Sequence, residues 1–195
     1  ELDSNTVMDI AYVGSHGVHL RVGGMYNTAL SPGPGDIAPR KMFPHAATAF
    51  FDRSWGTSRY NSFQFQLKRR HSNGFSYLVA YTFSDSKDIC SGWFNEDGCN
   101  PQDPYKWKDN WGYSAFNMPH VLTTSWVYEL PTGPSGKWST GNKALDHVLG
   151  PWQVNGILQF TSGQNYHVGL SGDSANTGNG GSNNINGGYL RANYS

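Results

Sequence analysis

The sequence contains few charged residues and no long hydrophobic run. Asp, Glu, Lys and Arg make up 14% of its 195 residues, whereas they make up about a quarter of an average soluble domain. The 14 basic and 14 acidic side chains cancel, so the net charge gives no attraction to nucleic acid. No apolar run approaches the roughly 20 residues of a membrane-spanning helix. Insertion through β-strands stays open, because barrel strands are only half apolar.

The sequence also lacks the motifs of common catalytic and metal sites. It contains no HExxH, no CxxC and no GxSxG. His16 and His19 lie in a glycine-containing loop rather than on a helix, and Gly178–Gly181 lacks the Lys-Ser/Thr of a phosphate loop. We therefore expect no enzymatic activity and no cofactor. The alternative is a hydrolase or oxidase built on histidines, such as His16, His19 and His120, and on acidic residues, but no sequence motif supports it.

What the sequence does contain is alternation, together with aromatic residues that make up 14% of the chain. From Arg59 to Ser86, apolar and polar residues alternate on both sides of Asn73-Gly74, a dipeptide suited to a tight hairpin turn. Each predicted strand has about ten residues, close to the 9–11 of a barrel strand. The pattern predicts an all-β fold, an antiparallel meander that forms a portion of a transmembrane β-barrel. A hairpin of a soluble β-sandwich is the alternative.

The connections favour the barrel. Other predicted elements are strands at Asn5–Val13, Asn117–Leu130 and Trp152–Ser162, a short strand at Thr48–Asp52 and a helical turn at Lys143–Leu149. Long irregular connections, such as Gly14–Ser58 and Asp85–Phe116, alternate with a short turn, as extracellular loops alternate with periplasmic turns in outer-membrane barrels. We expect residues 1–170 to form a barrel segment of about five to seven strands, and residues 171–195 to form a Gly/Asn/Ser-rich loop or tail.

Four phrases follow one another along the chain. They are DIAYVGSHGVHL (Asp9–Leu20), RYNSFQFQLKRRHSNGFSYLVAYTFSDSKD (Arg59–Asp88), AFNMPHVLTTSWVYELPTG (Ala115–Gly133) and GPWQVNGILQFTSGQNYHV (Gly150–Val168). In this order they resemble the C-terminal barrel of Oar-like TonB-dependent outer-membrane receptors, a group that often carries a carboxypeptidase-regulatory-like domain.

The resemblance implies a barrel of 22 strands around a plug domain, energised by the TonB–ExbB–ExbD complex. This sequence contains neither a plug nor a TonB box and has too few strands for that barrel. We interpret it as a fragment of a receptor in the Gram-negative outer membrane that imports a large ligand of the oligosaccharide or siderophore class. Its partners would be the plug, the remaining strands and outer-membrane lipid. The alternative is a self-standing, secreted β-protein that binds carbohydrate or self-assembles through its strand edges.

The segment from Asp85 to Phe116 contains the candidate binding residues. Aromatic side chains amid Asn, Asp and Gln are suited to stacking on a sugar or an aromatic siderophore. They are Trp93, Phe94, Tyr105, Trp107 and Trp111. Packing of the loop onto itself through these rings is the alternative.

Acidic side chains cluster in the same segment and flank two cysteines. Oxygen-rich loops of this kind can bind Ca²⁺, although the spacing does not match an EF-hand. Solvated surface charge is the alternative. The acidic residues are Asp85, Asp88, Glu96 and Asp97. Cys90 and Cys99 are expected to form a disulfide in an oxidising compartment, and two free thiols are the alternative.

Overall fold

The structure is a computed structural model. It describes residues 4–47, 49–92, 101–133, 137–148, 150, 152–165, 169–170, 172–179 and 190–191.

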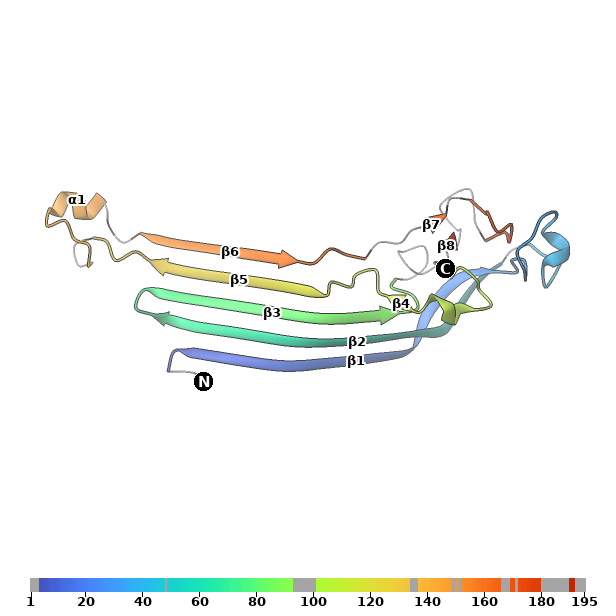
Figure 1. The fold of residues 1–195 in the computed structure, drawn as a ribbon, viewed down its shortest axis with the longest axis horizontal. Coiled ribbons are helices and arrows are strands. Elements are labelled where there is room, and N and C mark those ends of the chain that lie inside the picture. The colour runs from blue at the N-terminus through green and yellow to red at the C-terminus, as the bar shows by residue number, and fades with distance from the viewer. Residues whose placement is uncertain are drawn as a thin grey trace. The chain divides into compact units, whose positions relative to one another are not determined.

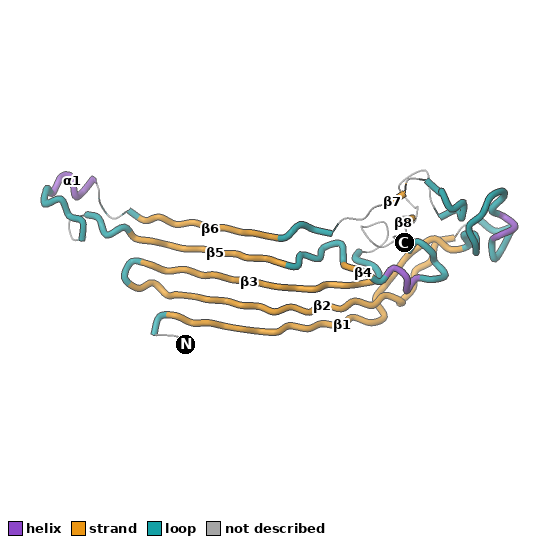
Figure 2. The backbone as a smooth tube through the Cα atoms, in the orientation of Figure 1, coloured by secondary structure: helices purple, strands orange, loops and turns teal. Residues whose placement is uncertain are grey.

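The described residues form a meander in which five long strands are neighbours in chain order (Figure 1). These strands are β1 (Thr6–Tyr26), β2 (Ala49–Ser72), β3 (Phe75–Asp88), β5 (His120–Glu129) and β6 (Gln153–Thr161). The short strand β4 (Gly112–Tyr113) pairs with β3, and β7 (Gly169–Leu170) pairs with β8 (Leu190–Arg191). The helices are the 3-10 helices η1 (Ala38–Arg40) and η2 (Trp107–Asn110) and the α-helix α1 (Lys143–Val148). Strands dominate the chain (Figure 2), which confirms the predicted antiparallel all-β fold.

The chain divides into two compact units. The first comprises Glu1–Val13, Ser62–Ser84 and Pro119–Ser162, and the second comprises Gly14–Asn61, Asp85–Met118 and Gly163–Ser195. β5 and β6 lie within the first unit, and the short elements η1, η2 and β4 lie within the second.

In the first unit, the register of β3, β5 and β6 sorts the side chains onto two faces. Val79 lies opposite Thr124, which lies opposite Leu158. Because successive side chains of a strand point to opposite faces, the rest of each face follows. The apolar face carries Phe75, Tyr77, Val79, Tyr81, Phe83, His120, Leu122, Thr124, Trp126, Tyr128, Val154, Gly156, Leu158 and Phe160. The polar face carries Ser76, Leu78, Ala80, Thr82, Val121, Thr123, Ser125, Val127, Glu129, Gln153, Asn155, Ile157, Gln159 and Thr161.

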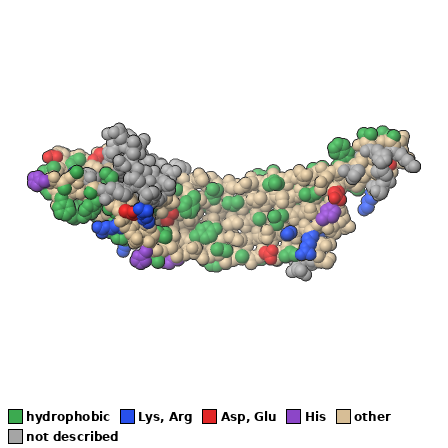
Figure 3. Space-filling view, turned by 180° about the vertical axis from the view of Figure 1, so that it is seen from behind, with side chains coloured by type: hydrophobic (Ala, Val, Ile, Leu, Met, Phe, Trp, Pro, Cys, Tyr) green, Lys and Arg blue, Asp and Glu red, His purple; other side chains and the backbone are tan. Residues whose placement is uncertain are grey.

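The middle of these strands is free of charged side chains. No Asp, Glu, Lys or Arg occurs in Ser62–Leu67, Phe75–Ser84, Val121–Tyr128 or Val154–Thr161. On the face that Figure 3 shows, charged side chains gather towards the strand ends, with green and tan side chains between them. β5 and β6 have 10 and 9 residues, about the length that crosses a bilayer when a strand is tilted.

β2 contains one residue more than β3 over the length that they share. Both residues of the Asn73-Gly74 turn have positive φ angles, 53° and 76°, as in a type I′ turn, which sets Ser72 opposite Phe75. Farther along, the N–H of Ile89 donates to the carbonyl oxygen of Thr57 at 3.2 Å. Fifteen residues separate Thr57 from Ser72, but fourteen separate Phe75 from Ile89. β2 therefore contains a β-bulge.

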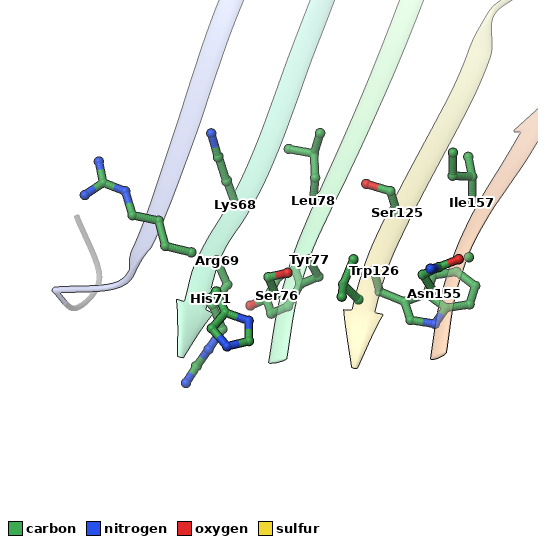
Figure 4. Close-up of a pocket in the computed structure, with 13 residues that line it drawn as sticks. Lys68, Arg69, His71, Ser76, Tyr77, Leu78, Ser125, Trp126, Asn155 and Ile157 are labelled. Carbon is green, nitrogen blue, oxygen red and sulfur yellow. The ribbon is translucent and has the colours of Figure 1, made fainter. Parts of the chain in front are cut away.

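The bulge decides which side chains of β2 reach each face. Figure 4 shows Lys68 level with Leu78 and pointing to the same side of the sheet, so the extra residue lies between Lys68 and the turn. Without it, Lys68 would lie opposite Val79 on the apolar face. With it, Lys68 joins the polar face, and the alternate apolar side chains of Phe63–Leu67 join the apolar face.

The prediction of an irregular connection from Gly14 to Ser58 is wrong, because β1 and β2 extend far into this segment. Its glycines lie where the two strands pack closely. A Cβ atom at Gly17 would lie 2.6 Å from Ser58 Oγ, and one at Gly56 would lie 2.9 Å from Leu20 Cβ. Glycine in a strand often marks such a close approach, so a composition typical of a loop belongs here to paired strands.

The connection between β5 and β6 contains the predicted helical turn, α1. Asp146 of α1 is buried, and its carboxylate accepts hydrogen bonds from the Ser139 hydroxyl at 2.6 Å and from the Thr140 hydroxyl and N–H at 2.7 Å each. These bonds, led by that of Ser139, stabilise the charged form and hold the pKa of Asp146 below its usual range. This connection therefore has its own hydrogen-bonded structure.

β1 and β6 are the edge strands of the sheet within the described residues. Backbone groups at an open edge have no partner in the interior of a bilayer, where each costs several kcal/mol. Both edges therefore need further strands if the sheet is to cross a membrane. None of the helices in the described part of the chain has the length and apolar character to span a membrane.

Val79 and Ala80 give a matched test of the two faces. Val79→Arg would place a charge on the apolar face, midway between Phe75 and Phe83, and should lower the free energy of unfolding by about 2–4 kcal/mol. Ala80→Arg would place the same charge on the polar face and should change it by about 0.5 kcal/mol. Urea titration of tryptophan fluorescence in lipid vesicles, with the chain in its barrel, measures both. Equal losses would contradict the assignment of the faces.

Candidate functional site

In the second unit, five aromatic side chains from both strands and loops form one continuous cluster. We call Tyr26, Phe51, Trp55, Tyr105 and Trp107 the aromatic cluster. The ring of Tyr26 is 6.5 Å from that of Phe51 and 5.7 Å from that of Tyr105, and Phe51 is 5.5 Å from Trp55. Trp55 and Trp107 stack at 5.7 Å with planes 18° apart.

Local hydrogen bonds hold Tyr105 and Trp107, the two cluster residues that lie outside the long strands, in place. The N–H of Tyr105 donates to Asp103 Oδ1 at 2.8 Å, and its hydroxyl donates to the carbonyl oxygen of Thr28 at 3.1 Å. Trp107 begins η2, and the buried amide of Asn110 donates to its carbonyl oxygen at 3.2 Å. The rings are thus held by the backbone around them.

Two cations border the cluster. Arg53 Cζ lies 4.6 Å from the centre of the Trp55 ring, and Lys108 Nζ lies 5.6 Å from that of Trp107. Phe51 is buried, but the four other rings are half-buried. The cluster therefore combines packed ring faces with exposed edges and nearby donors, which suits a flat ligand with hydroxyl or carboxylate groups.

Side-chain amides and one guanidinium order the loops around the cluster. The amide of Asn27 donates to the carbonyl oxygens of Phe43, Ala46 and Ala47 at 3.0–3.1 Å. Arg40 donates to the carbonyl oxygen of Ser31 at 2.7 Å. These bonds tie the β1–β2 connection to itself.

Residues 172–179 are attached to the same loops. The amide of Asn176 donates to the carbonyl oxygens of Gly33 and Gly35 at 2.8 Å each. The amide of Asn179 donates to those of Pro101 and Gln102 at 3.1 and 2.8 Å. Part of the Gly/Asn/Ser-rich segment thus helps to order the second unit.

The structure separates the aromatic residues that the sequence grouped as ligand contacts. Tyr105 and Trp107 belong to the aromatic cluster, whereas Trp111 lines a different hollow. Trp93 and Phe94 lie outside the described residues. Sequence reasoning missed three cluster members, Tyr26, Phe51 and Trp55, which lie in the segment taken as an irregular connection. Their proximity to Tyr105 depends on tertiary pairing and has no sequence signal.

The predicted calcium site and disulfide are tested only in part. Asp85 lies 3.7 Å from Lys87 Nζ, and the buried carboxylate of Asp88 accepts a hydrogen bond from Ser91 Oγ at 2.9 Å. Within the described ranges, no group of three or more His, Cys, Asp or Glu residues is arranged to hold a metal ion. Glu96, Asp97 and Cys99 lie outside those ranges. The Ca²⁺ site and the Cys90–Cys99 disulfide therefore stay predictions.

A further hollow lies on the polar face of the first unit, beside the Asn73-Gly74 turn (Figure 4). Its volume is about 780 Å³. β2 contributes Lys68–His71, and the neighbouring strands contribute Leu78, Ser125 and Ile157, among others.

The hollow is rich in hydrogen-bond donors. His71 Nε2 lies 3.5 Å from Glu129 Oε2, while Arg69 Nε is buried and has no hydrogen-bond partner in the described part of the chain. Lys68, Arg69, Arg70 and His71 all line the hollow. Their charged or polar donors suit a partner with acceptor groups.

Tyr105 provides a pH test of the cluster. Burial raises the pKa of its phenol above the ordinary value of about 10. The folded state therefore keeps this proton to higher pH than the unfolded state, and stability should fall as the pH rises above about 10. In a titration followed by phenolate absorbance, Tyr105→Phe should remove amplitude from the high-pH end of the curve. If Tyr105→Phe removed phenolate amplitude only near the ordinary tyrosine pKa of about 10, the buried environment of the Tyr105 phenol would be contradicted.

Comparison with known proteins agrees with this geometry. The chain matches the family described as outer membrane beta barrel domain over residues 1–194. No curated protein and no solved structure matches it. The alternation of apolar and polar faces and the strand lengths are those that a membrane barrel requires. With the match covering nearly the whole chain, this protein belongs to the outer membrane beta barrel domain family.

Proposed function

We propose that this chain is a section of the barrel of a TonB-dependent receptor, which imports a large ligand of the oligosaccharide or siderophore class across the outer membrane. In this proposal the protein is a transporter rather than an enzyme. Its partners are the remaining barrel strands, an inner plug domain and, through the parent receptor, the TonB complex. The resemblance of the four sequence phrases supports this choice among outer-membrane barrels.

The observation that carries the proposal is the hollow on the polar face beside the turn. The polar face of a barrel strand points inward, and Lys68–His71 line the hollow there. The three cationic residues Lys68, Arg69 and Arg70 lie side by side in this lining, and such side chains favour a partner with acceptor groups. A plug domain inside the barrel would fill the hollow and supply such acceptors, whereas an open, water-filled pore would leave the hollow to solvent.

The aromatic cluster supports the ligand class. Long loops lie on the extracellular side of outer-membrane barrels, opposite the short turns, and the cluster lies at the loop end of β1 and β2. Half-buried Trp and Tyr rings next to Arg53 and Lys108 suit stacking on a sugar ring or an aromatic chelator. Ca²⁺ at Asp85, Asp88, Glu96 and Asp97 would be a further aid to loop order in this proposal.

Uptake by cells that produce the receptor containing this chain tests the proposal. Cells offered oligosaccharides and ferric siderophores should take up a member of one class, and uptake should require TonB. The double variant Tyr105→Ala/Trp107→Ala should bind this ligand roughly tenfold more weakly, because both stacking surfaces are lost.

Trp138→Ala is the matched control. Trp138 is also exposed, but it lies in the β5–β6 connection of the first unit and is not a member of the aromatic cluster, so its variant should keep normal binding. Uptake that continues without TonB, or equal losses in the control and the double variant, would count against the proposal.

The edge strands favour a second candidate, a self-standing secreted β-protein that self-assembles. Within the described residues β1 and β6 each have one strand neighbour in the sheet, and open edges are templates for pairing with other chains. This candidate predicts that the isolated chain, without detergent, is monodisperse or forms ordered filaments in size-exclusion chromatography with light scattering. Amorphous aggregation that detergent reverses would exclude it.

A further inference from the structure

We propose that a small pocket in the second unit binds a protonated primary amino group of the imported ligand. The pocket has a volume of about 140 Å³ and is lined by residues 28–32, 102–104, 175 and 177, all of which belong to the second unit. This inference rests on the proposed function, because it assigns the pocket to the same ligand. It narrows that ligand to the amine-bearing members of the two classes.

Hydrogen bonds join the three segments that form the walls of the pocket. The N–H of Ala29 donates to the carbonyl oxygen of Thr177 at 2.8 Å. The Tyr105 hydroxyl donates to the carbonyl oxygen of Thr28 at 3.1 Å, and the amide of Asn179 donates to the carbonyl oxygens of residues 101 and 102. The three walls are therefore parts of one hydrogen-bonded structure.

The lining combines apolar walls with hydrogen-bond acceptors and one charge. Alanine, leucine and proline side chains make up the apolar part, and hydroxyl or amide groups come from Thr28, Ser31, Gln102 and Thr177. Among the described residues that line the pocket, Asp103 is charged and none is Lys, Arg or His. A carboxylate without a cation beside it in the lining favours a positively charged group over an anion.

The geometry of Asp103 leaves one carboxylate oxygen available to a ligand. Oδ1 accepts the N–H of Tyr105 at 2.8 Å, and the backbone carbonyl oxygen of Asp103 accepts the N–H of Lys106 at 3.1 Å, so a turn holds the side chain. Asp103 is half-buried and forms no ion pair in the described part of the chain. An ammonium group can therefore bind at Oδ2 without displacing the Tyr105 N–H.

Two other charged groups lie near the pocket but outside its lining. Arg40 donates to the carbonyl oxygens of residues 31 and 176 at 2.7 and 2.8 Å. The carboxylate of Asp173 accepts the N–H of Thr177 at 2.9 Å. Both side chains are engaged with the backbone, so Asp103 determines the charge at the lining itself.

The volume of the pocket limits what can enter. A water molecule takes up about 30 Å³ of the liquid, so the pocket has room for roughly four or five waters. A complete sugar ring or a ferric chelate is larger than this. An ammonium group on a short aliphatic arm fits, because its three donors match the carboxylate and the hydroxyl groups. Its methylene groups would contact Pro32 and Pro104, which line the pocket.

Tyr105 joins the pocket to the aromatic cluster. Its ring lies 5.7 Å from that of Tyr26, while its N–H and its hydroxyl are bonded to Asp103 and Thr28 of the lining. A ligand that stacks on the cluster can therefore extend an arm into the pocket. Two kinds of ligand carry such an amine: an oligosaccharide that contains glucosamine, and a ferric hydroxamate siderophore whose chain ends in a primary amine.

The test measures the binding of paired probes to the receptor that contains this chain, purified in detergent. One pair is a glucosamine oligosaccharide and its N-acetylated form, and the other is a ferric hydroxamate with a free terminal amine and its N-acetylated form. In one pair the amine form should bind about tenfold more tightly, because acetylation removes the charged hydrogen bond to Asp103. Isothermal titration calorimetry measures the four affinities, and the pair that shows the preference identifies the ligand class.

Variants separate charge recognition from the shape of the pocket. Asp103→Asn keeps the size of the side chain and the acceptor for the Tyr105 N–H but removes the charge. It should bind both forms of the probe equally, with the affinity of the wild type for the acetylated form, which shows that the loop is intact. Ala175→Leu fills the pocket from another wall and should also abolish the preference. Asp36→Asn is the matched control, since it removes an equal charge from an exposed residue outside the lining, and it should keep the full preference.

The outcomes distinguish this inference from the proposed function. Equal affinities of the amine and acetylated forms in the wild type would overturn the inference, and so would a preference that survives in either pocket variant. The proposed function would stand in both cases, because the ligand still binds. Absence of binding by all four probes would count against both.

Discussion

The pairing of backbone hydrogen bonds between strands is the constraint on which this structure depends. In an apolar medium a strand satisfies its N–H and C=O groups only through neighbours on both sides. Within the described residues, β2, β3 and β5 have two such neighbours in the sheet, whereas β1 and β6 have one. The apolar face can therefore meet lipid only when further strands continue the sheet at both edges. The sheet formed by the described residues therefore corresponds to part of a barrel wall.

One extra residue in β2 lets its apolar side chains lie on the same face of the sheet as those of β3. A β-bulge leaves a residue unpaired and exchanges the faces of the residues beyond it. Here the bulge lies next to a run of three cations, Lys68–Arg70. It sends Lys68 to the polar side and the apolar residues of Phe63–Leu67 to the lipid side. A strand without the bulge would have presented Lys68 to lipid and the rings of Phe63 and Phe65 to the interior.

The sequence predicted those elements that are determined by residues close together in the chain. Alternation located β5, β6 and the hairpin, Asn73-Gly74 predicted the turn, and residues 143–149 predicted α1. It failed where pairing between distant segments decides the outcome. The glycines of β1 and β2 suggested a loop because their reason, close approach of the two strands at Gly17 and Gly56, exists only once the strands have paired. The bulge has no signal in the alternation, because a change of register is invisible until both strands are placed. For the same reason Tyr105 and Trp111 seemed equivalent, although they lie in different environments.

The low charge of the chain is compatible with ordered loops because neutral amides and one guanidinium supply the order. Asn27, Asn176 and Asn179 each donate to two or more carbonyl oxygens, and Arg40 joins Ser31 to Asn176. These side chains donate hydrogen bonds to loop carbonyl oxygens, which in a helix or a sheet would accept from backbone N–H groups. Loops ordered in this way lose less conformational entropy when a ligand binds. If these loops bind a ligand as proposed, binding would rely on ring faces held in place, and a large net charge would be unnecessary.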